Sequence, residues 1–141
     1  FFPGLDLFIL TARETCATYV PELPANTRGQ SNFGGTVFID AEQGYGALRA
    51  LDIHTGDLEW EFTYPSPTFG GVMSTSSGLV FAGDHEGNFM AFSAETGENL
   101  WHYQTGSRIW GAAAITYMLD GLQYVLIPSG NTLTAFATRM P

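Results

Sequence analysis

One sequence pattern occurs twice in the chain, as GALRALDIHTGDLEW at residues 46–60 and as GNFMAFSAETGENLW at residues 87–101. The copies align without gaps and begin 41 residues apart, with Gly, Ala, Thr, Gly and Trp at matching offsets. A Thr-Gly pair suits a hairpin turn, because glycine reaches positive φ angles without strain. We therefore expect two related β-hairpins that carry Trp60 and Trp101 on their second strands. The alternative is two unrelated hairpins that share only their turn chemistry.

Short apolar or alternating runs, separated by turn residues, continue on both sides of this repeat. Helical periodicity is nearly absent, so the pattern predicts an all-β chain. Residues 19–35 are expected to form the one long loop. The expected strands are residues 6–12, 36–40, 47–52, 58–62, 71–75, 79–83, 89–93, 99–104, 112–118, 123–128 and 132–137.

The spacing of the repeat predicts how these strands are grouped. A third, partial copy begins at Gly130-Asn131 and stops before any Thr-Gly pair or tryptophan. A period of about 40 residues made of four short strands is typical of a β-propeller blade. We predict a partial β-propeller of about three four-stranded blades, in one segment divided near residues 1–62, 63–104 and 105–141. Trp60 and Trp101 are expected to pack between neighbouring blades, since each indole buries on the order of 200 Å².

The composition excludes several classes of function. The 141 residues are 45% hydrophobic, which is enough for a core, but no apolar run reaches the about 18 residues of a membrane-spanning helix. Fourteen acids face five arginines and no lysine, for a net charge of −9. Such a chain repels nucleic-acid phosphates and has no lysine for catalysis. Cys16 is the single cysteine, so an internal disulfide is excluded. The first residue is not Met, and we expect a segment of a longer protein.

Other polar clusters give no strong indication of a site. His54, His85 and His102 lack the spacing of zinc ligands, and we expect no metal site and no catalytic residue in this chain. Residues 84–88 have the composition of a calcium loop without its ligand spacing, so a solvated turn is expected. Trp110 follows Arg108, and three placements stay open: stacked on the arginine, facing the propeller axis, or simply buried.

The pattern Ala50-x-Asp52-x-x-Thr55-Gly56-x-x-x-Trp60 resembles the tryptophan-docking motif of the quinoprotein dehydrogenases. These are the alcohol, methanol and glucose dehydrogenases that use pyrroloquinoline quinone (PQQ) and form an eight-bladed propeller. The second copy fits with Ser93 in place of the acidic residue. The resemblance extends over about residues 44–137 and corresponds to the C-terminal part of such enzymes. It implies periplasmic oxidation of alcohols or sugars, with electrons passing through PQQ to a cytochrome.

The resemblance also implies where a site would lie. In the family, the catalytic aspartate, the ligands of a calcium or lanthanide ion and a vicinal disulfide belong to earlier blades, and no stretch of this chain matches them. The segment alone is therefore expected to be inactive. Phe69 stands where the family often has a tryptophan near the cofactor, although core packing is the other interpretation of this residue. The expected cofactor-binding residues are Phe69, Gly70, Gly71, Ser129, Gly130 and Asn131.

Two further hypotheses stay open. Several propellers with the same docking repeat only bind proteins, as outer-membrane assembly factors do, so a non-catalytic scaffold is the alternative function. The expected partners are the remaining blades of a propeller or other copies of this chain, because a piece of three blades leaves sheet edges open.

Overall fold

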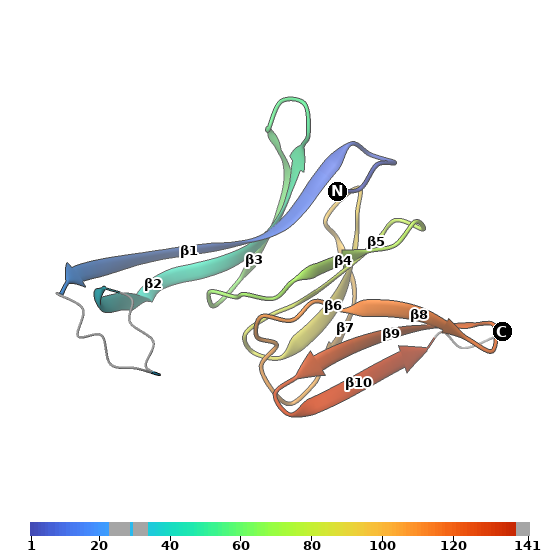
Figure 1. The fold of residues 1–141 in the computed structure, drawn as a ribbon. Helices are drawn as coiled ribbons and strands as arrows, with labels where there is room; N and C mark the ends of the chain where they lie inside the picture. Colours follow the sequence, from blue (N-terminus) through green and yellow to red (C-terminus); the bar gives the residue numbers. More distant parts are fainter. Residues whose placement is uncertain (23–28, 30–33, 138–141) are drawn as a thin grey trace.

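The computed structural model describes residues 1–22, 29 and 34–137. All regular structure in this part of the chain is β-strand (Figure 1), which confirms the predicted all-β class. Within it no helix is long and apolar enough to cross a membrane. The strands are β1 (Leu7–Pro21), β2 (Gly35–Asp52), β3 (Leu58–Tyr64), β4 (Val72–Ser74), β5 (Leu79–Gly83), β6 (Asn88–Ser93), β7 (Asn99–Gln104), β8 (Ile115–Leu119), β9 (Leu122–Ser129) and β10 (Thr132–Ala137).

The strands form three antiparallel sheets in chain order. The first sheet has the order β1-β2-β3, the second β4-β5-β6-β7 and the third β10-β9-β8. Within each sheet, the strands that pair are consecutive in the sequence, as Figure 1 shows. The two copies of the repeat occupy equivalent places, on β2–β3 in the first sheet and on β6–β7 in the second. Both copies also carry a register irregularity at the same step, after Ala50 and after Ala91.

Four strands per sheet were expected, and among the described residues only the second sheet has them. In the first sheet, the residues before β1 form a tight turn closed by the bridge Phe2↔Leu7 and do not form a further strand. In the third sheet, β10 is the last described strand and nothing pairs with its outer edge within the described ranges. The division near residues 62 and 104 stays a prediction, and β3 itself continues to Tyr64.

The first hairpin is longer than the sequence indicated. The expected strands 36–40 and 47–52 are one continuous strand, β2, which pairs with β1 from Leu7↔Asp52 to Pro21↔Gly35. The expected loop 19–35 is therefore paired at both of its ends, and the rest of it falls mostly outside the described residues. A register shift between Glu14 and Cys16 separates the part beside β3 from the extended part, which projects away from the other sheets (Figure 1).

The second sheet contributes to a core on each of its faces because its central strands, β5 and β6, carry apolar residues on both sides. Successive residues of a strand point to opposite sides. On one side, Val80 and Phe92 join a core with the first sheet. On the other side, Phe89 joins a smaller core with Ile109, Ala114 and Ile127 from the following loop and the third sheet. The core shared by the first two sheets consists of Leu7, Ile9, Leu48, Ala50, Trp60, Tyr64, Val80, Ala82, Met90, Phe92 and Ala94.

Trp60 fixes the contact between the first and second sheets. It is 9% exposed, and its Nε1 donates a hydrogen bond to the carbonyl oxygen of Ala94 at 2.9 Å. Its ring lies against Gly97, where an added Cβ would come 2.6 Å from a ring carbon. The tryptophan of one repeat therefore covers the Thr-Gly turn of the next sheet.

Candidate functional site

The loop of residues 105–114, between β7 and β8, is held against the second sheet by its backbone. The amide of Thr105 donates to Gly87 at 2.9 Å, and that of Ile109 donates to Asp84 at 3.2 Å. The Ile109 side chain is fully buried under Gly83, where any Cβ would collide with it. This anchoring leaves the next residue, Trp110, on the surface with 52% of its area exposed.

The predicted segment Phe69-Gly70-Gly71 packs on this loop. The amide of Gly70 donates to the buried Thr68 hydroxyl at 3.2 Å, and the amide of Gly71 donates to Ala112 at 2.8 Å. A Cβ on Gly70 would lie 2.5 Å from the Gly83 carbonyl oxygen, and one on Gly71 would lie 2.6 Å from the Ala113 Cβ. Glycine is required at both positions because the neighbouring backbone comes so close.

Phe69 itself is a surface residue. It is 42% exposed, and its ring centroid lies 4.5 Å from that of Trp110. Of the two interpretations left open by the sequence, core packing does not fit this exposure.

The second predicted segment, Ser129-Gly130-Asn131, packs on the same loop. The amide of Gly130 donates to the carbonyl oxygen of Arg108 at 3.1 Å, and a Cβ on Gly130 would strike the Ser107 hydroxyl. Ser129 is 1% exposed, and its Oγ has no hydrogen-bond partner among the described residues. Asn131 is exposed. The two segments, 58 residues apart in sequence, thus meet the two ends of one short loop.

Two guanidinium groups flank the exposed aromatic pair. Arg13 lies 4.2 Å from the Phe69 ring centroid, and Arg108 lies 5.3 Å from that of Trp110. His85 packs edge-on against Trp110 at 5.2 Å. Arg13 Nε and His85 Nδ1 are buried without a partner among the described residues. The sequence pointed to Trp110 and Arg108 through their adjacency, but Arg13 reaches Phe69 only because β1 pairs with β2, which no local pattern could reveal.

The turn at residues 84–88 is not the solvated turn that was expected. Asp84 is 2% exposed, and its carboxylate accepts hydrogen bonds from the amide and from the side-chain Nδ2 of Asn88, both at 2.7 Å. These bonds close the turn and use the carboxylate oxygens locally. In the described part of the chain, no three His, Cys, Asp or Glu side chains come close enough to hold a metal ion.

Burial also affects a tyrosine beside this turn. Tyr64 is 1% exposed, and its hydroxyl has no partner among the described side chains and backbone. Desolvation raises the pKa of Tyr64 well above its usual range, and the nearby charge of Asp84 acts in the same direction. Tyr64 is therefore a neutral, structural side chain at neutral pH.

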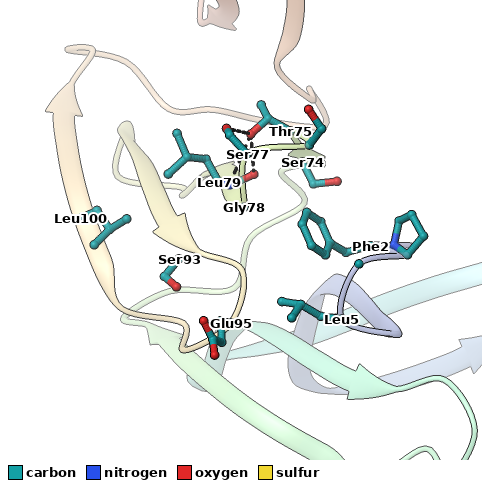
Figure 2. A pocket seen from close by; sticks show the side chains of 13 residues that line it. Phe2, Leu5, Ser74, Thr75, Ser77, Gly78, Leu79, Ser93, Glu95 and Leu100 are labelled. Atoms are coloured by element: carbon teal, nitrogen blue, oxygen red, sulfur yellow. Dashed lines mark hydrogen bonds between the residues drawn. The ribbon is translucent and has the colours of Figure 1, made fainter.

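One cavity lies away from both predicted segments. It measures about 820 Å³ and separates the N-terminal turn from the β4–β5 turn, as Figure 2 shows. Phe2 and Leu5 face serine and threonine hydroxyls across it, and Thr75 and Ser77 are hydrogen-bonded to each other at 2.9 Å. Glu95 is the one carboxylate that lines it. None of the predicted site residues borders this cavity.

Known proteins resemble this chain in sequence. A family model described as "Outer membrane protein assembly factor BamB" matches residues 18–139. A quinoprotein alcohol dehydrogenase of Pseudomonas putida, PedH, is 44% identical over 85 residues, which are 60% of this chain and 14% of that protein. A quinoprotein ethanol dehydrogenase of Pseudomonas aeruginosa is 36% identical over 126 residues, which are 88% of this chain and 20% of that protein.

Solved structures show the same relationship in three dimensions. A europium-containing methanol dehydrogenase matches with a TM-score of 0.79 and 30% identity over 91% of this chain and 23% of that one. A quinohemoprotein alcohol dehydrogenase of Pseudomonas putida matches with a TM-score of 0.78 and 29% identity over 93% of this chain and 21% of that one. The chain thus has the predicted partial β-propeller fold and spans about a fifth of the length of these proteins. It belongs to the propeller family that the matching model describes, and it is a PQQ-dependent dehydrogenase-like chain.

Proposed function

We propose that this chain supplies part of the wall of a PQQ site in a periplasmic alcohol or sugar dehydrogenase. The observation that carries the proposal is the meeting of residues 69–71 and 129–130 on the loop 105–114, beside two exposed aromatic rings. The relatives named above, which are quinoprotein dehydrogenases, support the same assignment.

The residues present fit the chemistry of this cofactor. PQQ is a flat aromatic quinone with three carboxylates, and such a ligand needs apolar rings to stack on and cations to neutralise it. Phe69 offers an exposed ring with the Arg13 guanidinium 4.2 Å from its centre, and Arg13 Nε lacks a partner among the described residues. When bound, PQQ supplies the two-electron oxidant for the alcohol.

Each predicted segment has a definite part in the proposed wall. Phe69 and Arg13 bind and orient the cofactor edge. Gly70 lets the backbone approach Gly83 of β5 closely, and Gly71 lets it approach Ala113 of the loop 105–114, which would exclude water behind the wall. Ser129, Gly130 and Asn131 hold the opposite end of the loop, through the bond from Gly130 to Arg108.

The rest of the proposed mechanism lies outside this chain. The resemblance places the catalytic aspartate, the calcium or lanthanide ligands and the vicinal disulfide in other blades, so we propose that the chain alone does not turn over an alcohol. The electrons would pass to a cytochrome. The remaining blades, or other copies of the chain, would cover the open faces, with Trp60 and Trp101 acting as tryptophan-docking residues between blades near residues 1–62, 63–104 and 105–141.

A titration of the 141-residue chain with PQQ, followed by tryptophan fluorescence, tests the wall. We expect saturable quenching, with an affinity that falls about fivefold in Phe69→Leu, because one aromatic stacking contact is worth on the order of 1 kcal/mol. Phe8→Leu is the matched control, since Phe8 is 48% exposed on β1 and is not part of the wall. Equal affinity of both variants for PQQ would contradict the proposal.

The scaffold alternative also has one supporting observation, the description of the family model as an assembly factor. If PQQ in the same titration does not quench the wild-type chain at any concentration up to millimolar, the scaffold function becomes the better assignment.

A further inference from the structure

Trp110, Arg108 and His85 form a second, more exposed half of the aromatic cluster, which we call the Trp110 surface. The indole is 52% exposed, with the Arg108 guanidinium 5.3 Å from its ring and the His85 ring 5.2 Å away. A guanidinium beside an exposed indole combines a flat apolar face with a fork of N–H donors. This combination suits one class of ligand, a planar ring that carries a carboxylate.

The charge of Arg108 is not neutralised by an acid in the part of the chain that the structure describes. Arg49, by contrast, is paired with Glu14 and Glu61. Among the described residues, Arg108 makes no ion pair, although the chain has 14 acids and five arginines. The acid next to His85, Glu86, accepts a hydrogen bond from the Ser66 hydroxyl. An unpaired arginine on an acidic protein is therefore left with its donors available to an anion from solution.

The position of the Trp110 surface relates it to the proposed cofactor wall. The rings of Trp110 and Phe69 touch, with centroids 4.5 Å apart, while their arginines belong to different elements, Arg13 to β1 and Arg108 to the loop 105–114. A ligand stacked on Trp110 would lie beside a ligand stacked on Phe69. An oxidant and its substrate react only when they are bound side by side, and these two adjacent rings would hold them in that way.

We propose that the Trp110 surface selects the substrate, and that the preferred substrates are alcohols with an aromatic ring and a carboxylate. The ring stacks on the Trp110 indole, and the carboxylate accepts hydrogen bonds from the Arg108 guanidinium. His85 supports the indole from its edge. The proposal rests on the function proposed above, because it assigns a substrate to the site next to the cofactor wall.

The test is a titration of the 141-residue chain with 4-(hydroxymethyl)benzoate, followed by the indole N–H signals in ¹H–¹⁵N NMR spectra. Trp110→Phe assigns the Trp110 signal. We expect this signal to shift in a saturable way, while the Trp60 signal stays fixed because its N–H is bonded to Ala94. Benzyl alcohol, which lacks the carboxylate, should bind about tenfold more weakly, since a charge-assisted hydrogen bond is lost.

Variants at Arg108 show whether the carboxylate of the ligand is bound by the guanidinium or whether only the ring stacks on Trp110. Arg108→Gln should lower the affinity for 4-(hydroxymethyl)benzoate about tenfold. Arg108→Lys should lower it less, because lysine keeps the positive charge but lacks the paired N–H donors of the guanidinium. Arg49→Gln is the charge-matched control. Its side chain lies on the opposite face of the first sheet from Arg13, since their register partners alternate, and it should bind as the wild type does.

A parallel titration with PQQ distinguishes this proposal from the proposed function. Retained PQQ binding in Arg108→Gln, with loss of 4-(hydroxymethyl)benzoate, supports the substrate assignment. Equal loss of both ligands would show one continuous cofactor site, which overturns the substrate assignment and leaves the proposed function intact. No shift of the Trp110 signal with 4-(hydroxymethyl)benzoate, or a shift unaffected by Arg108→Gln, overturns it as well.

Discussion

The repeat places a tryptophan at two contacts between neighbouring sheets. Trp60 at the contact of the first and second sheets is buried, whereas Trp101 at the contact of the second and third sheets is partly exposed. Trp60 is 9% exposed, covers Gly97 and donates to Ala94. Trp101 occupies the equivalent place in the next repeat but is 39% exposed, and its indole N–H has no partner among the described residues. Its ring packs against Phe136 of the third sheet at 5.2 Å.

The difference shows what a repeat unit contributes by itself. The tryptophan is present in both copies, but only Trp60 meets a described Thr-Gly turn in the following sheet. Beside Trp101, a cavity of about 350 Å³ remains between Phe81, Phe89 and Phe136. The second half of the contact is therefore supplied by the next repeat, and the docking energy belongs to pairs of sheets rather than to single ones.

The largest expected effect comes from removing the two indoles. Trp60→Ala should lower the free energy of unfolding by about 3–5 kcal/mol, the usual cost of truncating a buried aromatic side chain. Trp101→Ala should cost clearly less, about 1–2 kcal/mol, because its ring loses less buried area. Urea denaturation measures both. Equal costs would mean that the two contacts are energetically alike despite their geometry.

A pair of turn glycines sharpens the comparison. Gly97 and Gly56 are equivalent in the repeat and have φ angles of +70° and +77°, but only Gly97 lies under an indole. Gly56→Ala should cost about 1 kcal/mol for the left-handed backbone alone. Gly97→Ala should cost about 2–4 kcal/mol, since the methyl group must also displace the Trp60 ring. Thermal unfolding of the two variants tests this order, and a larger loss in Gly56→Ala would refute it.

A smaller effect isolates the hydrogen bond of Trp60. Trp60→Phe keeps a ring over Gly97 but leaves the Ala94 carbonyl without its donor, at a cost of about 1–3 kcal/mol. In Trp101→Phe no hydrogen bond to a described residue is lost, so only the smaller ring matters. A ratio of the two losses near one, measured in urea, would show that the Trp60–Ala94 bond does not stabilise the contact.

The smallest effect is a pH dependence in the first contact. The pKa of Tyr64 is raised in the folded chain, first by burial and second by Asp84. This phenol ionises at a lower pH in the unfolded chain than in the folded chain. The stability that Tyr64 contributes is therefore complete below about pH 10 and is lost as the pH rises further. Tyr64→Phe should remove that part of the alkaline loss and should leave the free energy of unfolding nearly unchanged at pH 7, because the hydroxyl has no partner among the described residues. Parallel alkaline curves for the two proteins would contradict this.

Much of the fold could be predicted because the signals are local. The turn residues and the alternating runs gave the bounds of β5, β7 and β10 as the structure has them. The length of β2 could not be predicted, since residues 41–46, with Glu42, Gln43 and two glycines, interrupt the alternation, and the pairing with β1 continues on both sides of residues 41–44, at Tyr45 and at Asp40. The first and third sheets have three described strands each rather than four, because a period of about 40 residues does not show how many strands of each unit the described residues contribute.

The candidate site also contains residues that the sequence indicated and one that it did not. The glycines of both predicted segments were selected from their motif context, and each has a close neighbour in the structure: Gly83 beside Gly70, Ala113 beside Gly71 and the Ser107 side chain beside Gly130. Their role in cofactor binding stays a prediction. The cation beside Phe69 was missed, because Arg13 lies 56 residues away in sequence, on β1, whereas Phe69 lies in the connection between β3 and β4. The contact depends on the pairing of β1 with β2, and the composition of a single strand does not encode that pairing.

The most direct test of the central claim maps PQQ on the chain by backbone amide shifts in ¹H–¹⁵N NMR spectra. The account predicts that the shifts concentrate in residues 69–71, 105–114 and 129–131, and that Trp60 and the turn at residues 94–98 stay unchanged. Shifts confined to the cavity between the N-terminal turn and the β4–β5 turn, or no shifts at saturating PQQ, would contradict it.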